Sequence, residues 1–237
     1  MKHPRPTPRF IAFEGCDASG KSTQARLLAD RLGALLTREP GGTAGGRRIR
    51  SLLLDHSPEG RQLDVRAEAL LMAADRAQHV AEVLRPGLAA GLTIVSDRYI
   101  GSSLAYQGYG RGLAVAEVRR ISEWATGGLW PDVIVLLRVP LETAMIRLSD
   151  ERMPDRLENE GAGFLTRVIA GYDAMAAAEP ERWRIVDGVG EVDTVADRVW
   201  AAVDGSVGPA PAVEPRRLSS SSPARAGLQV TEGQNKS

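Results

Sequence analysis

Residues 15–22 read Gly-Cys-Asp-Ala-Ser-Gly-Lys-Ser and match the pattern G-x-x-x-x-G-K-[ST] at every fixed position. An apolar run at 10–13 precedes them and apolar residues at helical spacing follow, which predicts a buried strand (9–14), a turn and a helix from Lys21. In such a turn the backbone N–H groups converge, and the helix N-terminus and Lys21 add positive charge. The alternative is a chance glycine-rich turn, which the strand–turn–helix context disfavours.

The chain is therefore expected to bind a nucleoside triphosphate at this loop. Ser22 supplies a hydroxyl for a Mg²⁺ ion that bridges the phosphates, so Mg²⁺ is the expected cofactor. The expected contacts are Gly15, Cys16, Asp17, Ala18, Ser19, Gly20, Lys21, Ser22 and Thr23. Cys16 lies in an electropositive loop, where a redox role is the alternative to simple space filling.

Four more short apolar runs follow, at 34–37, 92–96, 132–137 and 183–186, with helical patterns between them. Helices are predicted over about 45–54, 64–90, 114–126, 160–178 and 192–203, with another from Pro140, whereas 101–112 is expected to form a loop. Strands that alternate with helices predict the α/β P-loop NTPase fold, a five-stranded parallel sheet flanked by helices on both faces. Ligands of such sheets bind beyond the carboxyl ends of the strands.

The composition and charge of the chain limit which partners and locations it can have. The 237 residues contain 30 Lys and Arg against 30 Asp and Glu, so no basic field indicates a nucleic-acid partner. No apolar run is long enough to span a membrane or act as a secretory signal, and the single cysteine is consistent with a cytoplasmic location. One domain that contains the phosphate loop is expected over 9–204. Residues 1–8 and the Ser-, Pro-, Ala- and Gly-rich 205–237 are expected to be disordered.

Two further motifs make the interpretation more specific. Residues 37–43 read Thr-Arg-Glu-Pro-Gly-Gly-Thr, and residues 97–107 read Asp-Arg-Tyr-Ile-Gly-Ser-Ser-Leu-Ala-Tyr-Gln. With the Glu-Gly pair at 14–15, they resemble the thymidylate kinase family over roughly residues 9–203, in order and at the expected spacing. This resemblance implies a kinase that phosphorylates dTMP to dTDP with MgATP, in dTTP biosynthesis.

Three charged residues lie just beyond predicted strand ends. A reaction between two nucleotides brings two polyanions together, so cations must line the gap. Arg38 and Arg98 are suited to bidentate phosphate contacts, and the resemblance assigns them to the phosphate of dTMP. Asp97 suits a carboxylate that holds Mg²⁺ directly or through water. The alternative for all three is a surface salt bridge, which their position at the ligand edge of the sheet disfavours.

The resemblance also implies contacts to the sugar and base. Asp17 is expected to accept a hydrogen bond from the sugar 3′-hydroxyl, and Arg76 to contact a thymine carbonyl. Ser103 and Gln107 resemble further base contacts. Tyr106 resembles the tyrosine that occupies the space of a ribose 2′-hydroxyl, with plain core packing as its alternative.

Two positions depart from the family pattern. Met72 stands where the family usually has a phenylalanine stacked on the thymine ring; methionine can still cover the ring, but less rigidly. Arg138 stands where the family often has an acidic residue, and nothing in the sequence explains it.

The charged stretch at about 149–157 resembles the mobile lid that closes over ATP. Some family members carry a catalytic arginine in the phosphate loop and others, the bacterial kind, carry it in the lid. Since residue 18 is alanine, Arg152 is the expected transition-state cation, with Arg156 as a second candidate and a merely solvated charge run as the alternative. Arg147 is expected on the preceding helix. The family also implies a homodimer, formed through helices such as 64–90.

Two other functions compete with this interpretation. Another nucleoside or nucleotide kinase is disfavoured by the Arg-Glu-Pro-Gly-Gly-Thr and Ala-Tyr-Gln segments. A GTPase switch should carry an Asn-Lys-x-Asp stretch, which the sequence lacks. A regulatory ATP-binding protein should have lost Lys21 or the arginine pair Arg38 and Arg98, and the sequence keeps them all.

Overall fold

A computed structural model describes residues 10–54, 63–149 and 161–204. The predictions for 1–8, for 205–237 and for the lid from residue 150 onward, Arg152 and Arg156 included, lie outside these described residues. No helix in the described part is long and apolar enough to cross a membrane.

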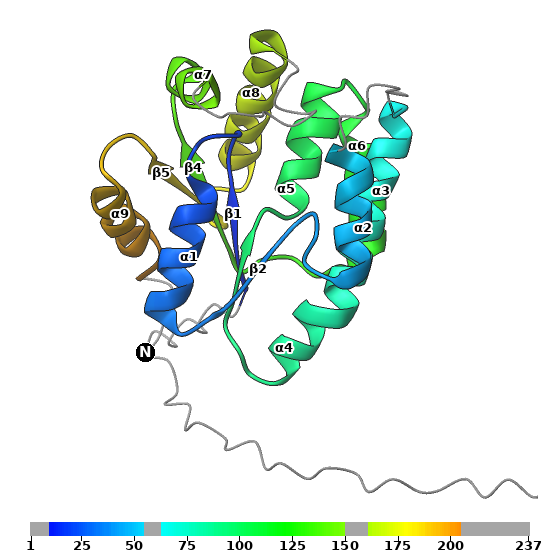
Figure 1. Ribbon diagram of the computed structural model, residues 1–237, viewed down its shortest axis with the longest axis horizontal. Coiled ribbons are helices and arrows are strands. Elements are labelled where there is room, and N and C mark those ends of the chain that lie inside the picture. Colours follow the sequence, from blue (N-terminus) through cyan, green and yellow to red (C-terminus); the bar gives the residue numbers. More distant parts are fainter. Residues whose placement is uncertain (1–9, 55–62, 150–160, 205–237) are drawn as a thin grey trace, which may run out of the picture.

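A five-stranded parallel sheet forms the centre of the molecule, as predicted (Figure 1). Its strands are β1 (Phe10–Glu14), β2 (Leu35–Arg38), β3 (Ile94–Asp97), β4 (Val133–Arg138) and β5 (Trp183–Asp187), in the order β2-β3-β1-β4-β5. β1 lies in the middle and all of its residues are buried. The segments that follow β1 and β3 are therefore neighbours, because these two strands pair directly.

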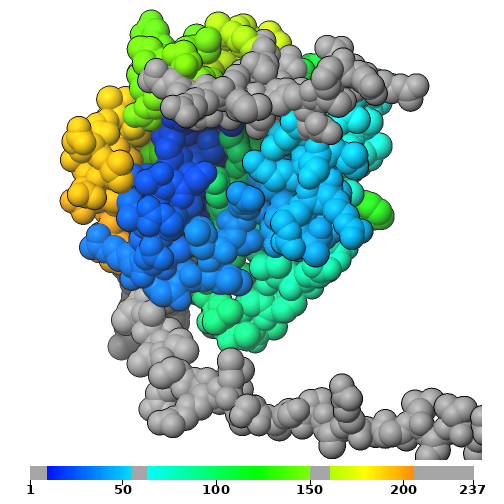
Figure 2. All heavy atoms as spheres, in the orientation of Figure 1, coloured from blue at the N-terminus to red at the C-terminus, as the bar shows by residue number. Residues whose placement is uncertain are grey.

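Alternation of side chains along the strands creates two core layers. Ile11 and Phe13 of β1 pack on one face with α1 (Lys21–Leu32) and α9 (Val192–Asp204). Phe10 and Ala12 pack on the other face, against residues of α6 (Val115–Thr126) and α8 (Ala162–Ala178). In the space-filling view α9 lies beside α1, and α2 (Ala44–Leu54) lies beside α3 (Val65–His79) (Figure 2).

Two of the predicted elements differ in the structure. The predicted helix 64–90 is α3 followed by a π-helical segment η1 (Val80–Leu84) and α4 (Arg85–Ala89). The prediction of a loop at 101–112 is wrong, because α5 (Ile100–Ser103) and the π-helical η2 (Leu104–Gly110) occupy most of it. Its glycines serve close packing: a Cβ on Gly110 would lie 2.6 Å from the ring of Phe164. Burial of Leu104 and Ala105 outweighs the weak helix propensity of these glycines.

The last helix before the undescribed lid is α7 (Leu141–Ser149). Arg147 lies on it, as expected, and donates hydrogen bonds to the Ala18 and Gly188 carbonyl oxygens at 3.2 and 3.4 Å. α7 also covers a small apolar cluster that contains Cys16, Ala144 and Leu148.

Candidate active site

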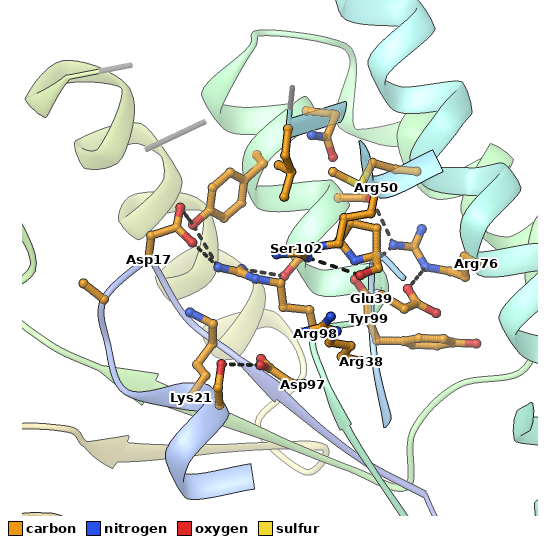
Figure 3. A pocket seen from close by; sticks show the side chains of 18 of the residues that line it. Asp17, Lys21, Arg38, Glu39, Arg50, Arg76, Asp97, Arg98, Tyr99 and Ser102 are labelled. Atoms are coloured by element: carbon orange, nitrogen blue, oxygen red, sulfur yellow. Dashed lines mark hydrogen bonds and ion pairs between the residues drawn. The ribbon is translucent and has the colours of Figure 1, made fainter. Parts of the chain in front are cut away.

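A cavity of about 320 Å³ lies beyond the carboxyl ends of β1, β2 and β3. The phosphate loop and the start of α1 form one wall, and the segments after β2 and β3, with α3 and η2, form the others (Figure 3). The cavity brings together every described residue that was predicted to contact the acceptor nucleotide: Asp17, Arg38, Met72, Arg76, Arg98, Ser103, Tyr106 and Gln107.

The phosphate loop turns sharply through backbone conformations that favour glycine. Gly15, Ala18 and Gly20 all have positive φ, and a Cβ on Gly15 would lie 2.5 Å from the Leu137 carbonyl oxygen, so only glycine fits there. Lys21 is buried, and its Nζ donates to the Cys16 carbonyl oxygen at 2.5 Å. Burial, helped by Arg98, lowers the pKa of Lys21.

A pair of oxygen donors lies next to this loop. The Ser22 hydroxyl donates to Asp97 Oδ2 at 2.5 Å, and Asp97 Oδ1 is buried without a partner among the described residues. Within that same part of the chain no three His, Cys, Asp or Glu side chains form a metal cluster. Mg²⁺ commonly uses one or two protein oxygens together with waters and phosphates, so Ser22 and Asp97 fit this ion.

Arg98 is held by several protein partners. Its φ is +75°, a conformation that costs energy for a residue with a Cβ. The guanidinium donates to Ser102 Oγ at 3.0 Å and to the Gly15 carbonyl oxygen at 3.3 Å, and it forms an ion pair with Asp17. Burial opposes ionisation of Asp17, but Arg98 and Lys21 outweigh it and lower the pKa of this carboxyl group.

Tyr106 connects the ion pair to the core. Its hydroxyl donates to Asp17 Oδ2 at 2.7 Å, while its ring packs edge-on against Phe164 with the ring centroids 5.9 Å apart. The residue both lines the cavity and packs in the core, so the two alternatives weighed for it are not exclusive.

The opposite wall is built around Arg76, which is only 1% exposed. Its Nε donates to Glu39 Oε2 at 2.7 Å, and its terminal nitrogens donate to Ser103 Oγ at 3.0 Å and to the Ser122 hydroxyl at 3.3 Å. Gln107 donates to the buried Glu68 at 2.8 Å. These polar groups are held in place within a wall that also contains the half-buried Met72.

The chain was compared with known proteins. The family model described as thymidylate kinase matches residues 13–199. A thymidylate kinase of Desulforudis audaxviator is 46% identical over 200 residues, covering 82% of this chain and 89% of that protein. One from Bifidobacterium longum is 45% identical over 205 residues, covering 84% of this chain and 96% of that protein.

A crystal structure of thymidylate kinase from Ehrlichia chaffeensis is 28% identical, with a TM-score of 0.68, and covers 84% of this chain and 100% of that chain. The chain belongs to the thymidylate kinase family. The family resemblance expected from the three motifs is therefore confirmed, and so is the P-loop NTPase fold.

Sequence reasoning missed several side chains that support the site of this family member. Glu39 is buried between Arg76 and His79, and the ring Nδ1 of His79 lies 2.8 Å from Glu39 Oε1. Arg50 of α2 lines the cavity and donates to the Pro40 carbonyl oxygen at 3.2 Å. The signal for Glu39 was its place in the Arg-Glu-Pro turn next to the predicted phosphate ligand. No comparable local signal marks Arg50.

The structure also bears on two unexplained residues. Cys16 packs with Ala144 and Leu148, and burial raises the pKa of its thiol, which favours space filling over redox chemistry. Arg138 forms an ion pair with Asp173 of α8 at 2.9 Å on the surface.

Proposed function

We propose that the cavity is where this chain binds dTMP beside the phosphates of ATP. The chain is an ATP:dTMP phosphotransferase that converts dTMP to dTDP, in line with its family. The observation that carries the assignment of the cavity is the convergence of Lys21, Arg38 and Arg98 at one edge of the sheet. Cations gathered around one cavity match a reaction in which two polyanions must meet.

The donor nucleotide is assigned to the phosphate loop. Residues 15–23 cradle the phosphates with backbone N–H groups, and Lys21 balances charge on the transferred group. Ser22 and Asp97 would hold Mg²⁺, which when bound neutralises charge on the phosphate oxygens. The acceptor phosphate is already ionised, so no general base is needed to activate it.

The acceptor nucleotide is assigned to the rest of the cavity. Arg38 and Arg98 bind its phosphate, and Asp17 accepts from the sugar 3′-hydroxyl while holding Arg98. Tyr106 excludes a ribose 2′-hydroxyl, since its own hydroxyl is already committed to Asp17.

The base is assigned to the wall around Arg76, with Ser103 and Gln107 as neighbouring polar groups and Met72 covering the ring. Arg76 uses Nε and both terminal nitrogens for protein partners that fix its plane. A fixed guanidinium loses little entropy when it binds a base carbonyl, which supports its role as a reader of the thymine ring.

Arg152 is proposed as the transition-state cation supplied by the lid. It lies outside the described residues, so the proposal rests on the sequence: residue 18 of the phosphate loop is alanine. An arginine delivered to the transferred phosphoryl group accelerates related reactions by several orders of magnitude.

A cytoplasmic location and the absence of a nucleic-acid partner also stay predictions from the sequence.

A homodimer is proposed on the surface of three adjacent helices. Leu52 of α2, Leu70 of α3 and Trp124 of α6 are 62%, 58% and 86% exposed. α3 packs against both α2 and α6, so these apolar side chains belong to neighbouring elements. Large exposed apolar groups of this kind are typical of protein interfaces.

The assignment of the base site is tested by ADP release with MgATP against dTMP, dUMP, UMP, dCMP, AMP and thymidine. We expect dTMP to be the best substrate and thymidine, which lacks the acceptor phosphate, to be inactive. Loss of the thymine methyl in dUMP should cost about 10- to 200-fold in kcat/KM. Equal rates with dTMP and dCMP would contradict the base site around Arg76, and folded protein that binds ATP but turns over no monophosphate would overturn the kinase function.

A further inference from the structure

Glu14 is a buried carboxylate next to the site that the proposed roles do not use. It ends β1, directly before the phosphate loop, and is 0% exposed. Three groups donate to its carboxylate oxygens: the Tyr99 backbone N–H at 3.0 Å, the Ser102 hydroxyl at 2.6 Å and the Tyr172 hydroxyl at 3.1 Å. Burying a carboxylate is costly even with such partners, so its presence calls for a reason.

Two of these donors, the Tyr99 N–H and the Ser102 hydroxyl, connect Glu14 to Arg98. Tyr99 is its chain neighbour, so Glu14 holds the peptide group that follows the strained Arg98 backbone. The N–H of Arg98 donates to the Phe13 carbonyl oxygen at 2.9 Å, and its carbonyl oxygen accepts from the Ser96 hydroxyl at 2.8 Å. Glu14 thereby completes a set of hydrogen bonds that keeps Arg98 at positive φ.

The second link passes through the hydroxyl of Ser102. Ser102 Oγ accepts from the Arg98 guanidinium at 3.0 Å and donates its single proton to Glu14 Oε2. Because the carboxylate takes that proton, the lone pairs of Ser102 remain available to Arg98. Glu14 therefore contacts Arg98 indirectly at both ends, the backbone and the guanidinium.

Gly101, which precedes Ser102, leaves space for the carboxylate of Glu14. A Cβ on Gly101 would lie 2.7 Å from Glu14 Oε1, so a side chain there would displace the carboxylate. Glycine at 101 thus leaves the room that Glu14 occupies, and Glu14 itself does not line the cavity.

We propose that Glu14 is a positioning residue for phosphoryl transfer, which holds Arg98 in place through Ser102 and the Tyr99 N–H. The proposal rests on the proposed role of Arg98 as a ligand of the acceptor phosphate. The charged and titratable groups that face Glu14 are Arg98, after β3, and Tyr172, on α8. Burial raises the pKa of Glu14 to about 7, against the opposing effect of Ser102 and Arg98, so its charge changes near neutral pH.

The test is E14Q, which keeps the size of the side chain. The amide oxygen can still accept from the Tyr99 N–H, but the amide group would donate toward Ser102 and turn its lone pairs away from Arg98. We expect kcat/KM for dTMP to fall about 10- to 100-fold, the scale of a small misplacement of a reacting group, with KM for ATP changed less than about twofold. Y172F is the comparison variant: it removes another donor to the same carboxylate, and because the Tyr172 hydroxyl also lies 3.0 Å from Ser102 Oγ but has no bond to Arg98, it should lower kcat/KM less than E14Q does.

A pH profile separates positioning from simple structural support. Wild-type kcat/KM for dTMP should fall as pH drops through about 7, as Glu14 becomes protonated, and E14Q should lack this step. Titration of the substrate phosphate is common to both proteins and does not distinguish them. An identical acid limb in both proteins would overturn the proposal.

A double-mutant cycle tests the route through Ser102. S102A should lower kcat/KM about as much as E14Q, and E14Q/S102A should be no worse than S102A alone. If E14Q does not fold, S102A still decides, since wild-type activity in S102A would overturn the proposal. An R98A variant with unchanged kcat/KM would instead show that the proposed function assigns the acceptor phosphate wrongly. An inactive R98A beside a fully active E14Q would reject only the role of Glu14.

Discussion

Asp17 lies inside a loop that binds phosphates, where a carboxylate is electrostatically unfavourable. Its partners account for it: Arg98 forms an ion pair with one oxygen, and the Tyr106 hydroxyl donates to the other at 2.7 Å. Lys21 adds a second positive charge that lowers the pKa of Asp17. The carboxylate therefore stays ionised, and it orients Arg98 and Tyr106, which both line the cavity.

Glu14 illustrates the opposite case, a buried acid that costs stability. Burial raises its pKa from 4.5 to about 7, so the folded protein binds this proton more tightly than the unfolded chain. This contribution to stability is present below about pH 4.5 and is lost as pH rises through about 7. Relative to E14Q, the wild-type free energy of unfolding should fall by about 2 to 3 kcal/mol between about pH 5 and about pH 8. Urea unfolding of both proteins across this range measures it, and parallel pH dependences would contradict the expected shift.

At the scale of elements, α3 holds the turn after β2 against the cavity. Asp75 Oδ1 accepts from the Gly41 N–H at 2.9 Å, while Arg76 and His79 both contact the carboxylate of Glu39. These three residues come from one helix, spaced so that they face the same turn. The position of α3 therefore sets both the arginine that we propose as the base contact and the segment after β2 that we propose as a phosphate contact.

His79→Ala tests this connection. His79 is 0% exposed, and its Nε2 lies 2.7 Å from Thr37 Oγ1, so the variant loses two hydrogen bonds and leaves a cavity. We expect a loss of about 2 to 4 kcal/mol in the free energy of unfolding. KM for dTMP should rise because Glu39 loses one of its two partners, whereas KM for ATP should not change. Urea unfolding and steady-state kinetics measure these effects.

Gln78→Ala is the control on the same helix. Gln78 is exposed and bonds to Glu82, so its removal should cost less than about 0.5 kcal/mol. A His79 variant that loses stability but keeps its KM for dTMP would show that the helix supports the fold without setting the site.

Local patterns predicted the elements that bind phosphate, because the glycines, Lys21 and Ser22 of the loop act through backbone geometry encoded within eight residues. The helix at 100–110 was missed for a physical reason: its glycines weaken helix propensity locally, and the burial that overrides them comes from α8, far away in sequence. The roles of Glu14 and His79 were missed likewise, since a buried polar group is recognised by its partners, and those lie 40 to 158 residues away.

At the scale of the whole molecule, the sheet order decides which segments share the site. β1 pairs with β3, and β3 pairs with β2, so the phosphate loop, the Asp97–Arg98 segment and the Arg38 segment lie side by side. β4 and β5 continue the sheet on the other side of β1. The cavity therefore opens over one half of the sheet, where α2 and α3 also lie (Figure 1).

The exposed apolar groups of α2, α3 and α6 lie on that same half, so dimerisation there would press on the helix that carries Arg76. Leu70→Asp should break the dimer, because a carboxylate buried without a partner in an interface core costs several kcal/mol. Light scattering after size-exclusion chromatography should give about twice the 25.4 kDa of one chain for the wild type and one chain mass for the variant. Ile185→Asp, at a 53% exposed position on β5, is the matched control and should stay dimeric. A monomeric wild type would contradict the proposed dimer. Loss of the dimer in both variants would contradict an interface specific to α2, α3 and α6.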